Sequence, residues 1–379
     1  MNTPDLKTAA LAAVVPDYVL SIAPYQAGKP IEELAREFKL DPASIVKLAS
    51  NENPLGMPES AQRALTAAAA SLGRYPDPNG FELKAALSAR YGVPAEWITL
   101  GNGSNDLLEL ASLALLAPGS ASVYAQHAFA VYKLATQARG ARHIVVPARD
   151  YGHDLDAMFA AIDSDTRLVF IANPNNPTGT FLPAAQVAAF LARVHERYGD
   201  RVTVLLDEAY NEYLAPDLRF DSARWVEQYS NLIVTRTFSK AYGLAGLRVG
   251  FAMAQPRLTD LLNRVRQPFN VNSLAQAAAV AALGDADFLQ RVYELNHSGK
   301  QALAEGFTRL GLQFVPSYGN FLLVRVGDAA RINLELLKRG VIVRPVVGDG
   351  LPDWLRVTVG LPEENTRFLQ ALAAILDAP

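Results

Sequence analysis

Short apolar runs alternate with longer segments of helical spacing through the middle of the chain. Ala- and Leu-rich segments such as Ala184–Gly199 predict helices, because their apolar residues recur every three to four positions. Near-continuous apolar strands that alternate with helices are typical of a mostly parallel sheet covered on both faces. The runs that predict this seven-stranded sheet are Trp97–Gly101, Ala121–Ala125, His143–Ala148, Arg167–Asn173, Arg201–Ala209, Asn231–Thr237 and Arg248–Ala254.

The pattern changes after Gln267. A helical stretch, Ser273–Leu310, precedes three further apolar runs at Gly319–Val326, Val341–Val346 and Trp354–Gly360. This order predicts a second, smaller α+β domain. We therefore expect an α/β protein with an N-terminal arm over residues 1–45, a large domain over 46–270 and a small domain over 271–379.

Composition narrows the classes of partner. The 379 residues are 50% hydrophobic and carry a formal net charge of −3, which gives no reason to expect nucleic acid or an anionic membrane as a partner. The chain has no cysteine, so disulfides and Cys-ligated zinc are excluded, and its five histidines lack metal-binding spacing. Pro16 and Asp17 interrupt the apolar stretch near the N-terminus, and no run reaches the roughly 20 residues of a membrane-spanning helix. We expect a soluble, cytoplasmic protein that binds small molecules and no metal.

Ligands of open parallel sheets bind at the carboxyl ends of the strands, so the residues that follow each strand decide the chemistry. After the first strand, Gly101–Asn105 could form a glycine turn that caps a helix, or could bind an anion at the helix N-terminus. After the fourth, "IANPNNPTG" could be a tight polar turn. Alternatively, Pro177 could restrict Asn176 so that its amide points at a ligand.

Asp207 ends a strongly apolar strand in "VLLDEAY". Burying a carboxylate there costs free energy unless a cation or a base pairs with it, so Asp207 is a candidate functional residue. Tyr210 lies three residues on and could reach the same ligand. The alternative is a surface strand end at which Asp207 and Glu208 are solvated.

Lys240 follows the next strand in "RTFSKAYGLAGLRVG". Thr237, Ser239 and Arg248 could converge there on a phosphate, with Arg248 giving a forked, charge-assisted contact. A partly desolvated lysine among these groups would lose basicity and become a nucleophilic amine. The alternative is an ordinary loop with a solvated lysine.

Taken together and in this order, the motifs between Gly101 and Arg248 resemble those of the fold-type I pyridoxal-phosphate (PLP) aminotransferases. Within that group the sequence is most similar to the histidinol-phosphate aminotransferase family, from about residue 20 to the C-terminus. The matching segments are "APYQAGKPIEELAREF", "KLASNENPLG", "RYPDPNG", "TFSKAYGLAGLRVG", "VIVRP" and "LRVTVG".

The resemblance implies PLP as cofactor and a role for each matching residue. Lys240 would hold the cofactor covalently and carry a proton, Asp207 would pair with the pyridine nitrogen, and Asn176 and Tyr210 would bind the ring oxygen. Phe129 would stack on the ring, although His127 stands where the family often has a proline. The cofactor phosphate would be bound by Gly103, Ser104, Asn105, Thr237, Ser239 and Arg248, and by Tyr75 of the neighbouring subunit of a homodimer.

The resemblance also implies the substrates. Arg356 would bind the substrate carboxylate, Arg344 and Arg356 the substrate phosphate, and Tyr25 in an arm packed near the active site would cover the substrate. The implied reaction converts L-histidinol phosphate and 2-oxoglutarate into imidazole-acetol phosphate and L-glutamate, in histidine biosynthesis. An aromatic amino acid aminotransferase and a threonine-phosphate decarboxylase are the alternative enzymes. A PLP-sensing regulator would normally carry a DNA-binding helix-turn-helix, for which we expect no room in the short N-terminal segment.

Overall fold

A mixed seven-stranded sheet forms the centre of the computed structural model, which describes residues 14–24 and 28–377. The strand order is β2-β8-β7-β6-β5-β3-β4, and β8 runs antiparallel to β2 and β7 while the other neighbours are parallel. The mostly parallel sheet predicted from the sequence is therefore confirmed. The strands are β2 (Ile98–Gly101), β3 (Ala121–Ala125), β4 (Arg142–Val146), β5 (Thr166–Ala172), β6 (Thr203–Asp207), β7 (Leu232–Thr237) and β8 (Gly250–Ala254).

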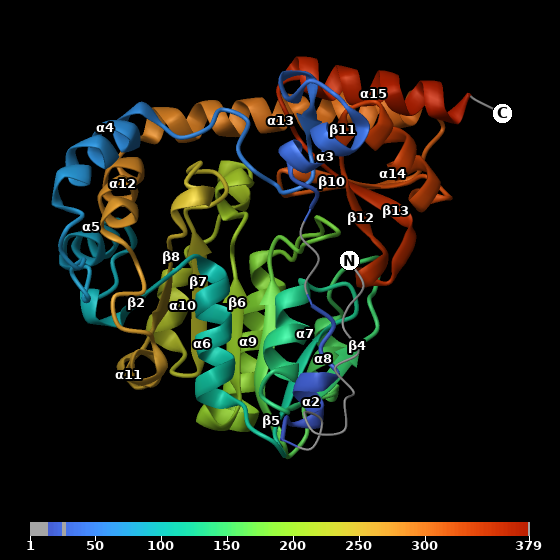
Figure 1. Ribbon diagram of the computed structural model, residues 1–379. Coiled ribbons are helices and arrows are strands. Elements are labelled where there is room, and N and C mark those ends of the chain that lie inside the picture. The colour runs from blue at the N-terminus through green and yellow to red at the C-terminus, as the bar shows by residue number, and fades with distance from the viewer. Residues whose placement is uncertain (1–13, 25–27, 378–379) are drawn as a thin grey trace.

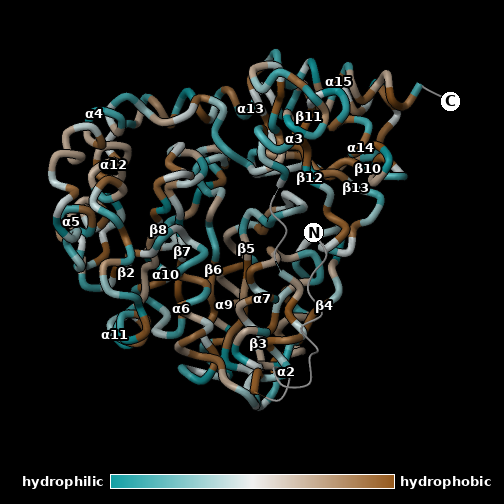
Figure 2. The backbone as a smooth tube through the Cα atoms, in the orientation of Figure 1, coloured by the Kyte–Doolittle hydropathy of each residue, from teal (hydrophilic) through white to brown (hydrophobic). Residues whose placement is uncertain are grey.

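Alternate side chains of the buried strands enter different cores, one on each face of the sheet. On β6, Val204 and Leu206 pack into the first core, while Leu205 packs into the second. In Figure 1, α6 and α7 cross the front of the sheet and α9 and α10 lie behind it, and in Figure 2 the sheet strands carry much of the brown, apolar colour. The first core is covered by α5 (Phe81–Tyr91), α9 (Ala184–Tyr198), α10 (Ser222–Gln228) and α12 (Ser273–Leu283), and the second by α6 (Ser104–Leu115), α7 (Ala130–Gln137) and α11 (Pro256–Val265).

A four-stranded antiparallel sheet of order β12-β13-β10-β9 forms a smaller unit, which lies above the large sheet in Figure 1. The predicted helical stretch Ser273–Leu310 is two helices rather than one, because the Asp285 carboxylate accepts a hydrogen bond from the N–H of Phe288 and starts a new helix. The elements are β9 (Phe314–Val315), β10 (Phe321–Arg325), β12 (Arg344–Val346), β13 (Leu351–Thr358), α13 (Ala286–Arg309), α14 (Ala329–Lys338) and α15 (Pro362–Leu376).

Residues near the N-terminus belong by packing to the smaller unit. The strand β1 (Val46–Lys47) pairs in parallel with β11 (Val341–Ile342), and α3 (Ile31–Phe38) buries Leu34 against the same region. By contrast, α12 shares the first core with the large sheet and packs on α4 (Glu59–Ala68). The predicted divisions at 45/46 and 270/271 stay predictions, and from this packing we propose a later start of the small unit, near Asp285.

None of the helices in the described ranges combines the length and the apolar character that crossing a bilayer requires.

Candidate active site

A cavity of about 240 Å³ opens at the carboxyl ends of β5, β6 and β7, below the smaller unit. It brings together most of the residues that the sequence singled out, from both units. The predicted residues that line it are Ser104, Asn105, Phe129, Asn176, Asp207, Tyr210, Thr237, Ser239, Lys240, Arg248, Arg344 and Arg356.

One end of the cavity gathers hydrogen-bond donors. Ser104 and Asn105 are the first residues of α6, so the positive end of that helix faces this end of the cavity. Arg248 lies beside them and donates from Nη1 to Ser239 Oγ over 3.2 Å. Gly103 has a φ of 84°, which favours glycine, and an added Cβ would lie 2.4 Å from Arg248 Nη2 and would displace this guanidinium group. Such a set of donors suits a phosphate.

Asp207 is buried at the end of β6 and is held by two hydroxyl groups. Its Oδ2 accepts a hydrogen bond from the Tyr132 hydroxyl over 2.9 Å, and its Oδ1 accepts one from Thr235 over 3.2 Å. Burial raises the pKa of Asp207 to about 6, against these hydrogen bonds, which favour the carboxylate. At neutral pH the group is largely ionised and can pair with a protonated ring nitrogen.

Glu208, the next residue, is also buried, so the solvated strand end considered for this pair is wrong. Arg236 on β7 meets Glu208 Oε2 at 2.8 Å from Nη2 and 2.9 Å from Nε. Ser222 donates to the same oxygen over 2.8 Å. This buried ion pair ties the ends of β6 and β7 together, and these ends carry Asp207 and Lys240.

Lys240 lines the same cavity as Asp207 and the group of donors. Its Nζ donates to the Ser50 carbonyl over 3.1 Å and lies 5.9 Å from the centre of the Tyr210 ring. Desolvation lowers the pKa of Lys240 to about 7, and the nearby charges of Arg356 and Arg248 act in the same direction. Near neutral pH a large share of this amine is therefore unprotonated and nucleophilic.

The Tyr210 hydroxyl accepts a hydrogen bond from Asn51 Nδ2 over 2.8 Å. Asn51 is fixed in turn by Thr358 of β13, whose hydroxyl donates to Asn51 Oδ1 over 3.0 Å. Sequence reasoning assigned no role to Asn51 or to Tyr132. Tyr132 could have been considered, since it lies in the first turn of α7, three residues after the ring-stacking candidate Phe129.

Two arginines of the smaller unit, Arg344 and Arg356, also line the cavity. Arg356 donates from Nη1 to Asn176 Oδ1 and from Nη2 to the Ala49 carbonyl, each over 2.7 Å. Because this oxygen of Asn176 is used, its amide hydrogens remain for donation to a ligand. Arg344 stands directly opposite Arg356 in the antiparallel pairing of β12 with β13. The arrangement is suited to an anionic ligand.

The remaining predicted residues lie at the cavity wall or away from it. Phe129 is half-buried and meets Tyr132 edge to face, with ring centres 5.9 Å apart. Tyr75 is 81% exposed, stacks on Phe269 and does not line the cavity of its own chain. Tyr25 falls outside the described residues. Within the described ranges, no cluster of three or more His, Asp or Glu side chains has the arrangement of a metal site.

Comparison with known proteins identifies the family. Residues 43–372 match the aminotransferase class I and II family. The chain is 69% identical over 365 residues to histidinol-phosphate aminotransferase 1 of Cupriavidus pinatubonensis, covering 95% of this chain and 96% of that protein. It is 67% identical over 365 residues to histidinol-phosphate aminotransferase 2 of Ralstonia nicotianae, with coverage of 95% and 96%.

A crystal structure of histidinol-phosphate aminotransferase from Sinorhizobium meliloti, in complex with pyridoxal-5'-phosphate, is 28% identical and matches with a TM-score of 0.85. The match covers 96% of this chain and 98% of that chain. It confirms the expected aminotransferase fold of type I. The chain therefore belongs to the class I and II aminotransferases, and among them to the histidinol-phosphate aminotransferase family.

Proposed function

We propose that the chain catalyses PLP-dependent transamination of L-histidinol phosphate with 2-oxoglutarate, giving imidazole-acetol phosphate and L-glutamate. One observation carries the proposal. The cavity brings together a lysine with a pKa of about 7, a buried carboxylate, a group of phosphate donors and two arginines. The relatives with 69% and 67% identity are named for the same activity.

The residues around the cavity fit PLP. Ser104, Asn105, Ser239 and Arg248 would hold its phosphate, with Thr237 and the Gly103 backbone beside them. Asp207 would face the ring nitrogen, Asn176 and Tyr210 the ring oxygen, and Phe129 one ring face. When bound, PLP supplies an electron-poor ring that stabilises negative charge on the substrate Cα.

Lys240 has two tasks in this proposal. Its amine anchors the cofactor, and its Nζ later removes the proton from the Cα of the amino donor. A pKa of about 7 suits both tasks, because a general base works best when its pKa lies near the operating pH. Asp207 stays ionised beside the ring nitrogen and keeps that nitrogen protonated.

Arg344 and Arg356 select the substrates. Both half-reactions use the same pocket, so its cations must accept a carboxylate in one and a phosphate in the other. Guanidinium groups bind either anion through two parallel hydrogen bonds, which favours Arg over Lys here. We assign the substrate carboxylate to Arg356, and the phosphate to Arg344 together with Arg356. Tyr25 would cover the substrate from the N-terminal arm.

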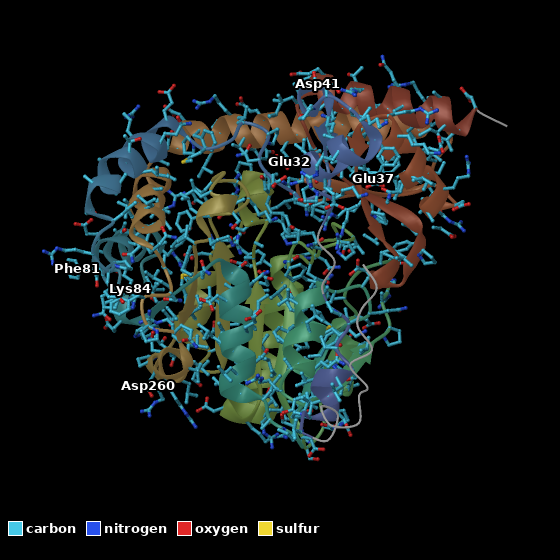
Figure 3. All side chains as sticks on the ribbon, viewed as in Figure 1. Glu32, Glu37, Asp41, Phe81, Lys84 and Asp260 are labelled. Carbon is cyan, nitrogen blue, oxygen red and sulfur yellow. The ribbon has the colours of Figure 1, made fainter. Side chains whose placement is uncertain are left out.

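The active form in this proposal is a cytoplasmic homodimer. A patch of apolar side chains that do not line the cavity is exposed, and Figure 3 shows Phe81 at the outer edge of α5. Tyr75 and Phe81 are 81% and 75% exposed, which is unusual for large aromatic residues. Covering this patch with a second copy would bring Tyr75 toward the cofactor phosphate of the neighbouring subunit. Sedimentation of the purified protein tests the dimer, and a monomer at micromolar concentration would contradict it.

The decisive experiment compares amino donors in steady state. The purified, PLP-loaded chain is assayed with histidinol phosphate, phenylalanine, tyrosine and threonine phosphate, each with 2-oxoglutarate. We expect the highest kcat/KM for histidinol phosphate. A higher value for phenylalanine or tyrosine would assign an aromatic aminotransferase instead. Release of carbon dioxide from threonine phosphate without 2-oxoglutarate would assign the decarboxylase.

A further inference from the structure

Both cavity arginines are carried by one hairpin of the smaller unit, residues 344–358, which we call the arginine hairpin. Arg344 on β12 pairs with Arg356 on β13, and a short turn, η8 (Val347–Asp349), forms the tip between the strands. The pairing shifts register between Pro345 and Val346, close to that tip. The tip position therefore influences where the two guanidinium groups lie.

His127 of the large unit holds this tip. It lies on the loop between β3 and α7, is only 8% exposed, and places Nδ1 2.7 Å from the carbonyl oxygen of Asp349. A carbonyl oxygen only accepts hydrogen bonds, so Nδ1 carries the proton and donates it. The contact joins two segments that are 222 residues apart in the chain.

Both sides of this contact are supported. The backbone carbonyl of His127 accepts a hydrogen bond from Asn175 Nδ2 over 2.8 Å, which fixes the loop that carries the imidazole. Tyr151 stacks beside the imidazole at 6.3 Å and meets Trp354 of the hairpin edge to face at 5.2 Å. The imidazole therefore lies in a defined place with respect to the strand that carries Arg356.

The contacts close a ring around the substrate side of the cavity. Arg356 donates to Asn176, whose chain neighbour Asn175 holds His127, and His127 holds the tip of the same hairpin. We propose that His127 is a positioning residue, which fixes the arginine hairpin so that Arg344 and Arg356 meet the anionic groups of both substrates. The identity of those substrates rests on the proposed function. A proline, which the family often has at this place, offers no side-chain donor for the Asp349 carbonyl.

The test compares substitutions of His127 in the PLP-loaded enzyme. His127→Ala removes the hydrogen-bond donor, and His127→Leu removes it while keeping more of the side-chain volume. His127→Asn keeps an N–H near the position of Nδ1. His195→Ala is the matched control, because His195 lies on α9, does not line the cavity, and makes a 3.0 Å hydrogen bond from Nδ1 to Asn231. KM and kcat are measured for histidinol phosphate and for 2-oxoglutarate.

We expect His127→Ala and His127→Leu to raise KM for both substrates by about tenfold, the effect of one lost hydrogen bond, and to change kcat by less than about threefold. His127→Asn should stay within about threefold of the wild type in both constants, and His195→Ala should match the wild type. Unchanged KM values in the Ala and Leu variants, or an Asn variant as impaired as Ala, would overturn the proposal.

Amide hydrogen exchange of residues 344–351 gives a second readout that needs no substrate. Exchange there should be about tenfold faster in His127→Ala than in the wild type or in His127→Asn. If the wild type fails to transaminate histidinol phosphate, the proposed function is wrong, and the exchange rates still decide the role of His127. Equal exchange in all three proteins would show that the histidine does not hold the hairpin.

Discussion

The Tyr132 hydroxyl should set the protonation state of Asp207, and Tyr132→Phe tests this with little change in shape. Tyr132 is fully buried, stacks on Phe170 at 4.6 Å and donates to Asp207 Oδ2 over 2.9 Å. The substitution removes only this donor and leaves the ring stacking in place. Thr235 keeps its hydrogen bond to the other carboxylate oxygen.

The size of the effect follows from the hydrogen bond that is lost. A hydrogen bond to a charged group is worth about 1.5–3 kcal/mol, and about 1.4 kcal/mol corresponds to one pKa unit. A value near the lower end, about 2 kcal/mol, moves the pKa of Asp207 from about 6 to roughly 7.5 in the variant. A substantial share of the variant would then carry a neutral carboxyl at neutral pH.

The assay is the dissociation constant of PLP as a function of pH. If only the carboxylate form binds the protonated ring nitrogen, the ratio of the variant constant to the wild-type constant should be near one at pH 9. It should rise to about fourfold at pH 7 and about fifteenfold at pH 6. Tyr124→Phe is the control, because its buried hydroxyl contacts His143 rather than Asp207.

A constant ratio between pH 6 and 9 would refute this reasoning. It would mean that Tyr132→Phe weakens PLP binding through packing, and that the hydroxyl does not control the charge of Asp207. A ratio that stays near one throughout would show that the hydrogen bond does not affect cofactor binding.

Four further outcomes are expected. Lys240→Ala should lower transamination by at least about a thousandfold with unchanged circular dichroism, and borohydride should no longer attach PLP to the protein; retained turnover would assign the proton transfer elsewhere. Gly103→Ala should weaken PLP binding about tenfold, because its Cβ meets Arg248; wild-type affinity in a fluorescence titration would contradict this. Arg344→Ala should raise KM for histidinol phosphate more than KM for glutamate, and equal increases would remove its phosphate role. Burial lowers the pKa of His153 to about 4, so the unfolded chain takes up the proton first as pH falls below 6.5. The wild type should thus lose about 2.5 kcal/mol of unfolding free energy between pH 7 and 4.5, and His153→Gln should lose less in urea denaturation; equal losses would exclude His153 as the cause.

The sequence predicted the meeting of Asp207 and Lys240 because it depends on strand order alone. Each residue follows an apolar strand, and the two strands are parallel neighbours in the sheet, so their carboxyl ends lie at the same edge. The boundary between α12 and α13 was not predicted, although its local signal is present: Gly284 ends one helix and Asp285 caps the next. Local signals of this kind extend over a few residues.

Contacts between residues that are far apart in the chain could not be predicted from such local signals. Asn51 and Tyr210 are 159 residues apart, and no periodicity in either segment relates one to the other. Whether Asp207 and Glu208 are solvated or buried likewise depends on the elements that cover the strand end. Glu208 can be buried because Arg236 and Ser222, from other segments of the chain, form hydrogen bonds to its carboxylate. Such pairings are set by how whole elements pack, which a single sequence does not encode locally.

The pairing of β1 with β11 gives the smaller unit a particular order of assembly during synthesis. Leu34 and Val46 leave the ribosome early, whereas Val341 and Ile342, their partners in the packed unit, are among the last residues made. At about 5–20 residues per second, the early segment waits roughly 15 to 60 s for these partners. Throughout that interval the apolar face of α3 and the edge of β1 are uncovered on the nascent chain. This segment therefore completes its packing only after nearly the whole chain has been made.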